Sequence, residues 1–284
     1  MFRIGVIGGS GLYEMEGLHD VESVKIKTPW GEPSDKFIKG KLGDIEFIFL
    51  PRHGKGHKIS PSEINYRANI YAMKMLEVDW LISVSAVGSM KNEIAPGHIL
   101  IPSQFIDHTK KRESTFFDGG VAVHVSMAHP VCPQLSQVLF NAAFDSGTPV
   151  HMGGTYICIE GPQFSSKAES ELYRLWEVDV IGMTNMPEAK LAREAEICYS
   201  TLALSTDYDC WHDDFGEVSV DDVIETLLKN VNMAKIILKN VVDLIPSEKK
   251  CGCSDALRNS IITIKDEIKN SNIKKIKLLI ERYI

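Results

Sequence analysis

Ile4-Gly5-Val6-Ile7-Gly8-Gly9-Ser10-Gly11 is a short apolar run that ends in glycines, and it decides the fold of this chain. Two later runs are built alike: Ile45 to Leu50 leads into Pro51-Arg52-His53-Gly54, and Trp80 to Val84 leads into Ser85-Ala86-Val87-Gly88-Ser89. Short runs rich in β-branched or aromatic residues and stopped by glycine are typical of buried strands that end in loops. The pattern predicts an α/β fold, in which ligands bind where strands end.

The residues at these three strand ends are suited to an anion. A glycine loop lets backbone N–H groups approach a ligand, and Ser10 and Ser85 add hydroxyl donors. The guanidinium of Arg52 fits a phosphate with two charge-assisted hydrogen bonds. If the three ends converge, they form a phosphate site.

Two predicted helix starts lie near this site. The capping box Ser60-Pro61-Ser62-Glu63 predicts a helix that follows the Arg52 loop. A predicted strand from Val178 to Met183 leads into Thr184-Asn185-Met186-Pro187-Glu188, which has the chemistry of a helix N-terminus. Such an N-terminus has free N–H groups and a positive dipole end, so it offers a fourth anion contact.

Composition limits the classes of function. The chain has 284 residues, 44% of them hydrophobic, which favours one large α/β domain over residues 1–284. A net charge of −7 with dispersed acidic residues disfavours nucleic acid as a partner. No apolar segment approaches the roughly 20 residues that span a bilayer, and glycines interrupt the N-terminal apolar stretch, which argues against a signal peptide. We therefore expect a cytoplasmic protein without a membrane partner.

The six cysteines are thinly spread, which disfavours a disulfide framework. Cys251-Gly252-Cys253 is the exception. Its spacing is too close for ordinary zinc pairing and no second pair or histidine lies nearby, so no metal is predicted. A loop with two incidental thiols and a local or long-range disulfide remain as alternatives.

The chain after about residue 219 is predicted to be helical. Ser219 caps a long helix whose apolar face includes Val223, Leu227 and Val231. The last stretch, through Ile273 to Tyr283, predicts an amphipathic helix whose apolar side covers this domain or a neighbouring subunit.

Asp207 and Asp209 follow the predicted buried strand that begins at Cys198. A spacing of two places both carboxylates on one side if the strand continues that far. Such a pair can bind a metal, act as acid and base, or form a turn. Beside a phosphate pocket, acid chemistry is the favoured role.

Six motifs in order and in spacing from about Arg3 to Val242 resemble the methylthioadenosine phosphorylases of the trimeric purine nucleoside phosphorylase superfamily, whereas the tail after about Pro246 matches less well. The motifs are Gly8 to Leu12, Pro51 to Gly54, Ser85 to Ser89, Glu160-Gly161-Pro162-Gln163-Phe164-Ser165-Ser166, Met183-Thr184, and Thr206-Asp207-Tyr208-Asp209-Cys210-Trp211. The Cys-Gly-Cys element resembles archaeal and bacterial members.

The resemblance implies the nucleoside phosphorylase fold, a single domain with a central mixed sheet flanked by helices. It implies phosphorolysis of methylthioadenosine to adenine and methylthioribose 1-phosphate, with phosphate as co-substrate and no cofactor, in a homotrimer or a hexamer built from trimers. Phosphate would be held by Ser10, Arg52, His53, Ser85, Ala86 and Thr184. The ribose would contact Met183, and the purine would contact Phe164, Ser165, Asp207 and Asp209. The methylthio group would contact Val220 and Val223. His124 and Leu278 of the next subunit would close the pocket.

The expected mechanism follows from the reaction. Breaking the N-glycosidic bond leaves an oxocarbenium-like sugar, which a bound phosphate stabilises and then captures. Asp207 would act as general acid at purine N7, or would hydrogen-bond the purine's own proton. A general acid requires a pKa above the ordinary value near 4, and burial and Asp209 would raise it.

Several of these residues, considered one at a time, are equally typical of ordinary structural roles. His53 could be a capping or core histidine, Met183 and Phe164 could be packing residues, and His124 fits a structural histidine about as well as a ligand contact.

Three other functions compete with this assignment. A Rossmann dehydrogenase is disfavoured because the third glycine of the fingerprint starting at Gly9 is replaced by Glu14. A non-catalytic nucleoside-binding protein is possible because fold alone does not give activity. A methylthioinosine, inosine or adenosine phosphorylase is the nearest rival, although paired carboxylates favour a 6-amino purine over a 6-keto purine.

Overall fold

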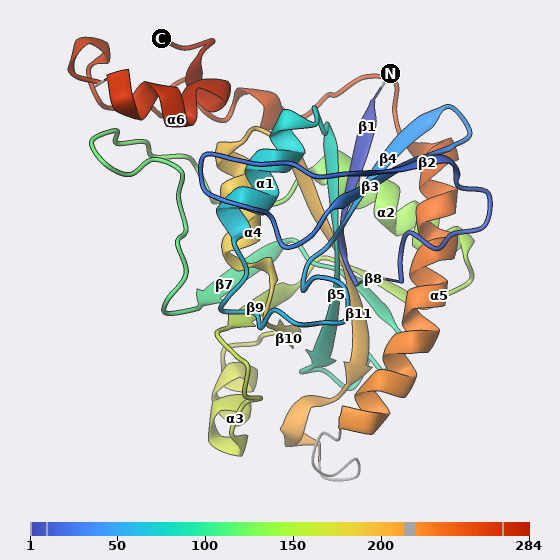
Figure 1. The fold of residues 1–284 in the computed structure, drawn as a ribbon. Helices are drawn as coiled ribbons and strands as arrows, with labels where there is room; N and C mark the ends of the chain where they lie inside the picture. The colour runs from blue at the N-terminus through green and yellow to red at the C-terminus, as the bar shows by residue number, and fades with distance from the viewer. Residues whose placement is uncertain (1, 10, 213–219, 269) are drawn as a thin grey trace.

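A computed structural model describes residues 2–9, 11–212, 220–268 and 270–284, and its centre is a mixed β-sheet (Figure 1). Within the described residues the sheet has eleven strands, with a main path in the order β2-β3-β4-β1-β5-β10-β9-β7. The remaining strands, β11, β6 and β8, extend from β5 on a second path. The strands are β1 Arg3–Gly8, β2 His19–Val24, β3 Phe37–Leu42, β4 Ile45–Pro51, β5 Trp80–Ser89, β6 Ile99–Ile101, β7 Gln104–His108, β8 Val150–Met152, β9 Thr155–Ile159, β10 Val180–Gly182 and β11 Cys198–Asp207.

The strands that carry the predicted site lie together at the centre of the sheet. β1 is parallel to both β4 and β5, and β5 is parallel to β11, so the carboxyl ends of these four strands meet at one edge. β10 runs antiparallel to β5. Along these strands the side chains are buried almost continuously, as expected for strands covered on both faces. The predicted mixed sheet is confirmed.

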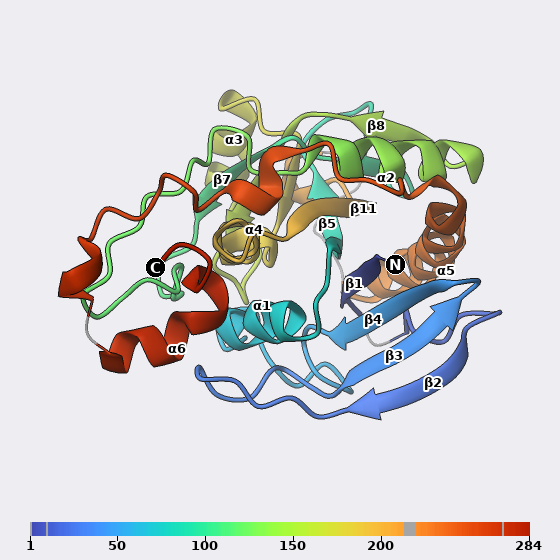
Figure 2. The same ribbon diagram turned by 90° about the horizontal axis from the view of Figure 1, so that it is seen from above.

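Helices cover both faces of the sheet (Figures 1 and 2). α1 and α4 pack on one face, and α2 and α5 pack on the other, where they contact each other and β11. Each face has its own apolar core. The helices are α1 Tyr66–Met75, α2 Pro133–Asp145, α3 Lys167–Leu175, α4 Asn185–Glu194, α5 Val220–Leu244 and α6 Asn270–Ile280, with short 3-10 helices η1 Asp209–Trp211, η2 Gly252–Asp255 and η3 Lys265–Glu267.

The predicted amphipathic helix near the C-terminus is α6, which lies beside α1 (Figure 2). Ile276, Leu279 and Ile280 are buried in the same core as the apolar face of α1. The apolar side of α6 therefore covers this domain. No helix in the described part of the chain has the length and apolar character needed to cross a bilayer.

Two local predictions differ from the structure. β5 does not end at Val84 but continues through Ser85 to Ser89, because β11 and β10 keep pairing with it. The carboxylate of Glu63 does accept hydrogen bonds from the N–H and hydroxyl of Ser60, but these residues form a turn. α1 starts later, with the Asn65 side chain capping the N–H of Ala68. The predicted cap Ser219 lies outside the described residues.

Candidate active site

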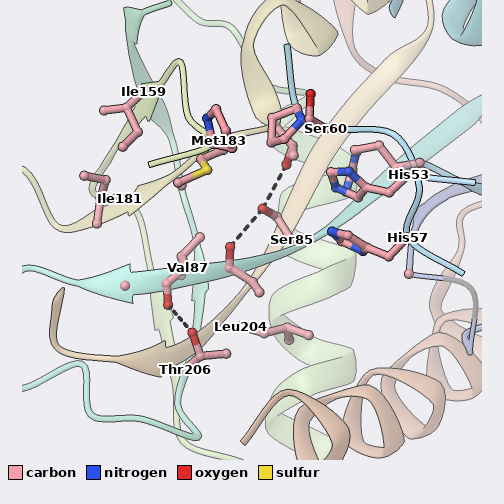
Figure 3. Close-up of a pocket in the computed structure, with 18 of the residues that line it drawn as sticks. His53, His57, Ser60, Ser85, Val87, Ile159, Ile181, Met183, Leu204 and Thr206 are labelled. Carbon is pink, nitrogen blue, oxygen red and sulfur yellow. Dashed lines mark hydrogen bonds between the residues drawn. The ribbon is translucent and has the colours of Figure 1, made fainter. Parts of the chain in front are cut away.

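A cavity of about 590 Å³ opens at the edge where the central strands end. Figure 3 shows His53 and His57 on one side of this cavity and Met183, Ile159 and Ile181 on the opposite side. Ten of the predicted site residues line it: Arg52, His53, Ser85, Ala86, Phe164, Ser165, Met183, Thr184, Asp207 and Asp209. The volume falls in the range typical of small-molecule sites.

Arg52 follows β4 and is 2% exposed. Its two-pronged face is directed at Glu188: Nε donates to Oε2 at 3.0 Å and Nη2 donates to Oε1 at 3.1 Å. Other N–H groups of Arg52 donate to Val84 O, Ile7 O and the Ser83 hydroxyl. Burial opposes the charge, but the Glu188 carboxylate outweighs it and raises the pKa of Arg52. The two-bond face that the sequence assigns to phosphate is thus used by Glu188, and the charge of Arg52 borders the cavity.

His53 is held as a neutral imidazole. Its Nδ1 lies 2.8 Å from the carbonyl of Ile59, which can only accept, so the proton is on Nδ1 and Nε2 is an acceptor. Burial, with a further contribution from the Arg52 charge, lowers the pKa of His53 to about 4. An anion with a proton to donate, such as monoprotonated phosphate, suits this nitrogen.

Hydroxyl groups from three elements meet at the same end of the cavity. Ser85 Oγ lies 3.2 Å from Thr184 Oγ1 and 3.1 Å from the Tyr156 hydroxyl. Thr184 takes the cap position of α4 but makes no side-chain cap bond, so its hydroxyl remains available to the cavity. Hydroxyl hydrogens can rotate to suit a ligand, which makes this group adaptable to an oxyanion.

Asp207 ends β11 at a β-bulge, where the register with β5 shifts between Ser205 and Asp207. Its Oδ1 accepts from the N–H of Asp209 at 2.8 Å. A methyl group at Gly88 would lie 2.9 Å from this Oδ1, so the glycine leaves room for the carboxyl group. Burial raises the pKa of Asp207, and the nearby charge of Asp209 acts in the same direction.

The Thr206 hydroxyl lies beside the Asp207 carboxyl group, and its hydrogen bond opposes part of the rise in the pKa of Asp207. The single hydroxyl hydrogen of Thr206 has two acceptors in reach, Val87 O at 3.2 Å and Asp207 Oδ2 at 2.7 Å. Figure 3 shows the bond from the Thr206 hydroxyl to the Val87 carbonyl.

Asp209 does not reach the cavity by strand alternation, because β11 ends at Asp207 and Asp209 begins η1 with a φ of 52°. It is 5% exposed, and its Oδ2 accepts from the Ser170 hydroxyl at 2.5 Å. Burial raises the pKa of Asp209. A strand end followed by a left-handed residue, rather than a continuous strand, therefore places both carboxyl groups at the cavity.

Phe164 and Ser165 line the cavity next to these carboxyl groups. The Phe164 ring is 52% exposed, which leaves it free to pack on a flat ligand. The Ser165 hydroxyl is buried and lacks a hydrogen-bond partner among the described residues. Buried polar atoms are nearly always paired, so this oxygen is ready for a ligand.

Some predicted residues do not meet in this cavity. His124 is exposed on the segment between β7 and α2, and Leu278 packs against the core from α6; neither lines the cavity of its own chain. Ser10 lies outside the described residues. The side chains of Val220 and Val223, at the start of α5, are also outside the described part.

Glu188 and Arg112 were not predicted from the sequence. Arg112, whose side chain is 1% exposed, donates to the carbonyls of Met183 at 2.7 Å, Met186 at 2.6 Å and Glu160 at 2.6 Å. It thereby fixes the backbone that carries Met183 and Thr184. No local sequence pattern indicates a role for Arg112. Glu188 could have been noticed, because it is the acidic residue in the first turn of a predicted helix.

The sheet with its nucleoside-sized cavity at the strand ends defines a protein of the phosphorylase superfamily. The family model described as "Phosphorylase superfamily" matches residues 3–243. Among curated proteins, the S-methyl-5′-thioadenosine phosphorylase of Geobacter sulfurreducens is 58% identical, and the match covers 99% of each chain. The chain belongs to the S-methyl-5′-thioadenosine phosphorylase family within this superfamily.

Solved structures agree with this assignment. A methylthioadenosine phosphorylase from an antarctic soil metagenomic library is 49% identical with a TM-score of 0.93, covering 97% of this chain and 98% of that one. A variant of the adenosine/methylthioadenosine phosphorylase from Schistosoma mansoni, in complex with methylthioadenosine, is 35% identical with a TM-score of 0.84, covering 91% and 96%. The predicted family and the nucleoside phosphorylase fold are confirmed.

Proposed function

We propose that this chain catalyses phosphorolysis of methylthioadenosine, giving adenine and methylthioribose 1-phosphate, in purine and methionine salvage. The observation that carries the proposal is one cavity that has an anion-binding end at Arg52 and Ser85 and also contains the carboxyl group of Asp207, whose pKa is raised by burial. The names of the relatives support the same reaction. Inorganic phosphate is the co-substrate, and the proposed steps use no cofactor.

In the proposed mechanism, phosphate binds between Arg52, His53 and the hydroxyls of Ser85 and Thr184, with Ala86 beside it. Its negative charge stabilises the oxocarbenium-like sugar as the glycosidic bond breaks, and an oxygen of phosphate then bonds to C1′. The electron pair of the broken bond leaves with adenine. Asp207 donates its proton to N7 of that leaving base.

The nucleoside occupies the rest of the cavity. Met183 lies against the ribose, Phe164 packs on the purine, and the unpartnered hydroxyl of Ser165 donates to the base. We assign Ser10 to the phosphate, and Val220 and Val223 to the methylthio group, on the family resemblance alone. The cytoplasmic location expected from the sequence stays a prediction.

The test is product analysis with methylthioadenosine, adenosine, methylthioinosine and inosine, each with and without phosphate. We expect adenine and a sugar 1-phosphate in equal amounts from methylthioadenosine, and no free base without phosphate. Equal base release in phosphate-free buffer would indicate a hydrolase. Preference for methylthioinosine or inosine would favour the 6-keto alternative.

Asp209 is the residue proposed to accept from the 6-amino group. Asp209→Asn should reduce kcat/KM for methylthioadenosine relative to methylthioinosine by about tenfold or more, because one charge-assisted hydrogen bond contributes about 1.5–3 kcal/mol. The ratio of the two kcat/KM values measures this. An unchanged ratio would remove Asp209 from recognition of the base edge.

A further inference from the structure

Four cysteines from three distant segments converge at the end of the sheet opposite the cavity. Within the described residues, the Sγ atoms of Cys132, Cys198, Cys251 and Cys253 all lie within 4.8 Å of one another. We refer to these four residues as the cysteine cluster. Cys132 caps α2, Cys198 begins β11, and Cys251 and Cys253 flank the start of η2.

The spacing of the sulfur atoms suits a single tetrahedral ion. A Zn–S bond of about 2.3 Å places two sulfurs of a tetrahedral site about 3.8 Å apart. The sulfur atoms of Cys198 and Cys251 are 3.3 Å apart, and no pair in the cluster is more than 4.8 Å apart, which is compatible with this value. Cys132, Cys198 and Cys253 are each less than 5% exposed, so water has little access to the centre of the cluster.

Positive groups lie beside the cysteine cluster. Cys132 Sγ accepts from the N–H of Leu135 at 3.5 Å, at the positive N-terminal end of α2. Arg193 Nη1 lies 3.9 Å from Cys253 Sγ. Positive groups of this kind offset the net negative charge of a four-thiolate site.

We propose that the cysteine cluster is a structural binding site for a soft divalent metal ion, namely Zn²⁺ held by four thiolates. All-sulfur ligands select zinc over magnesium or calcium, and four protein ligands leave no open position for catalysis. Binding displaces one proton from each thiol. The sequence predicts no zinc site, because no second pair of cysteines lies near Cys251 and Cys253 in the chain. The fold brings Cys132 and Cys198 to them as that second pair.

The position of the site indicates what it stabilises. β11 runs from Cys198 to Asp207, so the cysteine cluster and the catalytic carboxyl group lie roughly 30 Å apart at about 3.3 Å per residue. Beside the cluster, Lys249 pairs with Asp79 at 2.7 Å, and the N–H of Lys250 donates to Gln134 at 2.8 Å. A bound ion would fasten the segment that leads to α6 onto α2 and β11.

The first experiment measures metal in the full chain, expressed without a polyhistidine tag in zinc-supplemented medium and purified with a phosphine reductant and no chelator. Elemental analysis should find one zinc ion per chain. The double variant Cys132→Ser/Cys251→Ser should lose it. Cys210→Ser, which removes a thiol outside the cluster, should retain it.

A second measurement on the wild type keeps the proposal testable if the double variant does not fold. Metal-free, reduced wild type titrated with Co²⁺ should show thiolate-to-cobalt charge-transfer absorption and the intense visible bands of a tetrahedral site, saturating at one equivalent. Zn²⁺ should displace the Co²⁺, and hydrogen exchange in residues 245–284 should be slower with metal than without.

Two results would overturn the proposal. One is reduced wild type that binds neither ion at equimolar concentration. The other is purified protein without metal in which mass spectrometry finds the four cysteines paired as disulfides.

Discussion

At the scale of single residues, Asp207 has a pKa above its ordinary value. Burial raises its pKa, and the nearby charge of Asp209 acts in the same direction. The sequence left open whether Asp207 is protonated. Burial and the Asp209 charge favour the protonated form, whereas the hydrogen bond from the Thr206 hydroxyl favours the carboxylate.

Asp207→Asn should lower kcat by about 10²–10⁴, because an amide keeps the shape of the side chain but cannot protonate a leaving base. Asp207→Ala should do the same. Single-turnover kinetics with methylthioadenosine measure the chemical step, and circular dichroism checks the fold. Asp44→Asn, at an exposed turn, is the matched control and should be fully active. Near-normal turnover of both Asp207 variants would remove this residue from the chemistry.

Arg52 combines a structural and a functional role, because its two-pronged face engages Glu188 while its charge borders the cavity. Arg52→Met should lower the free energy of unfolding by about 3–5 kcal/mol, since it leaves a buried carboxylate without its partner. It should also raise the phosphate KM. Urea unfolding and steady-state kinetics measure the two effects.

Arg52→Met/Glu188→Leu separates those two roles. Replacing both members of a buried ion pair with apolar residues is often neutral for stability. We therefore expect the double variant to recover most of the unfolding free energy but not the phosphate KM. A wild-type phosphate KM in the double variant would place the anion away from Arg52.

At the scale of elements, α4 is fastened at both ends by buried carboxyl groups. Glu188 near its start binds Arg52, and Glu194 at its end accepts from the Thr115 hydroxyl and the Phe116 N–H, each at 2.7 Å. Burial raises the pKa of Glu194 to about 7 from its ordinary 4.5. The folded state therefore holds a proton at pH 5–7 that the unfolded chain releases.

The stability contribution of Glu194 should be present in full below pH 4.5 and lost as pH rises through 7. Between pH 5 and 8 the loss should be about 2–3 kcal/mol. Glu194→Gln mimics the protonated form and should remove this component. Urea unfolding of both proteins at both pH values gives the difference, in which other titrating groups cancel. Equal pH dependence in the two proteins would contradict the raised pKa.

The sequence predicted most elements, but it placed some ends wrongly because tertiary contacts set them. The glycine and serine residues after Val84 predict a loop, but pairing with β11 extends β5 beyond Val84, and β5 ends at Ser89. Ser60 and Glu63 form the expected hydrogen bonds, yet α1 begins at Tyr66. In the same way Asp209 was placed by strand alternation, although a left-handed turn positions it.

At the scale of the whole molecule, the sequence could not show which distant groups meet. The Arg52–Glu188 pair joins β4 to α4, and the cysteine cluster joins three segments, so neither leaves a local pattern. His124 and Leu278 were assigned to a neighbouring subunit, and neither lines the cavity of its own chain. Their roles, and the trimer or trimer-based hexamer that they require, remain proposals.

Complementation between inactive variants tests the assignment across subunits. Coexpressed Asp207→Ala and His124→Ala chains should form mixed oligomers in which some cavities combine Asp207 of one chain with His124 of the next. Activity of the mixture should exceed that of either variant alone, and a monomeric form should be poorly active. No recovery in mixed oligomers verified by mass spectrometry would keep His124 out of the neighbouring site.

The topology of the sheet has a consequence for synthesis of the chain. β5 is its central strand, yet its partners β10 and β11 are translated long after it, once β6 to β9 have left the ribosome. Until then a nascent chain exposes one unpaired, apolar edge of β5, the kind of edge to which other chains add. Protection of that edge during translation, for instance by a chaperone, is therefore expected to determine how much enzyme a cell obtains.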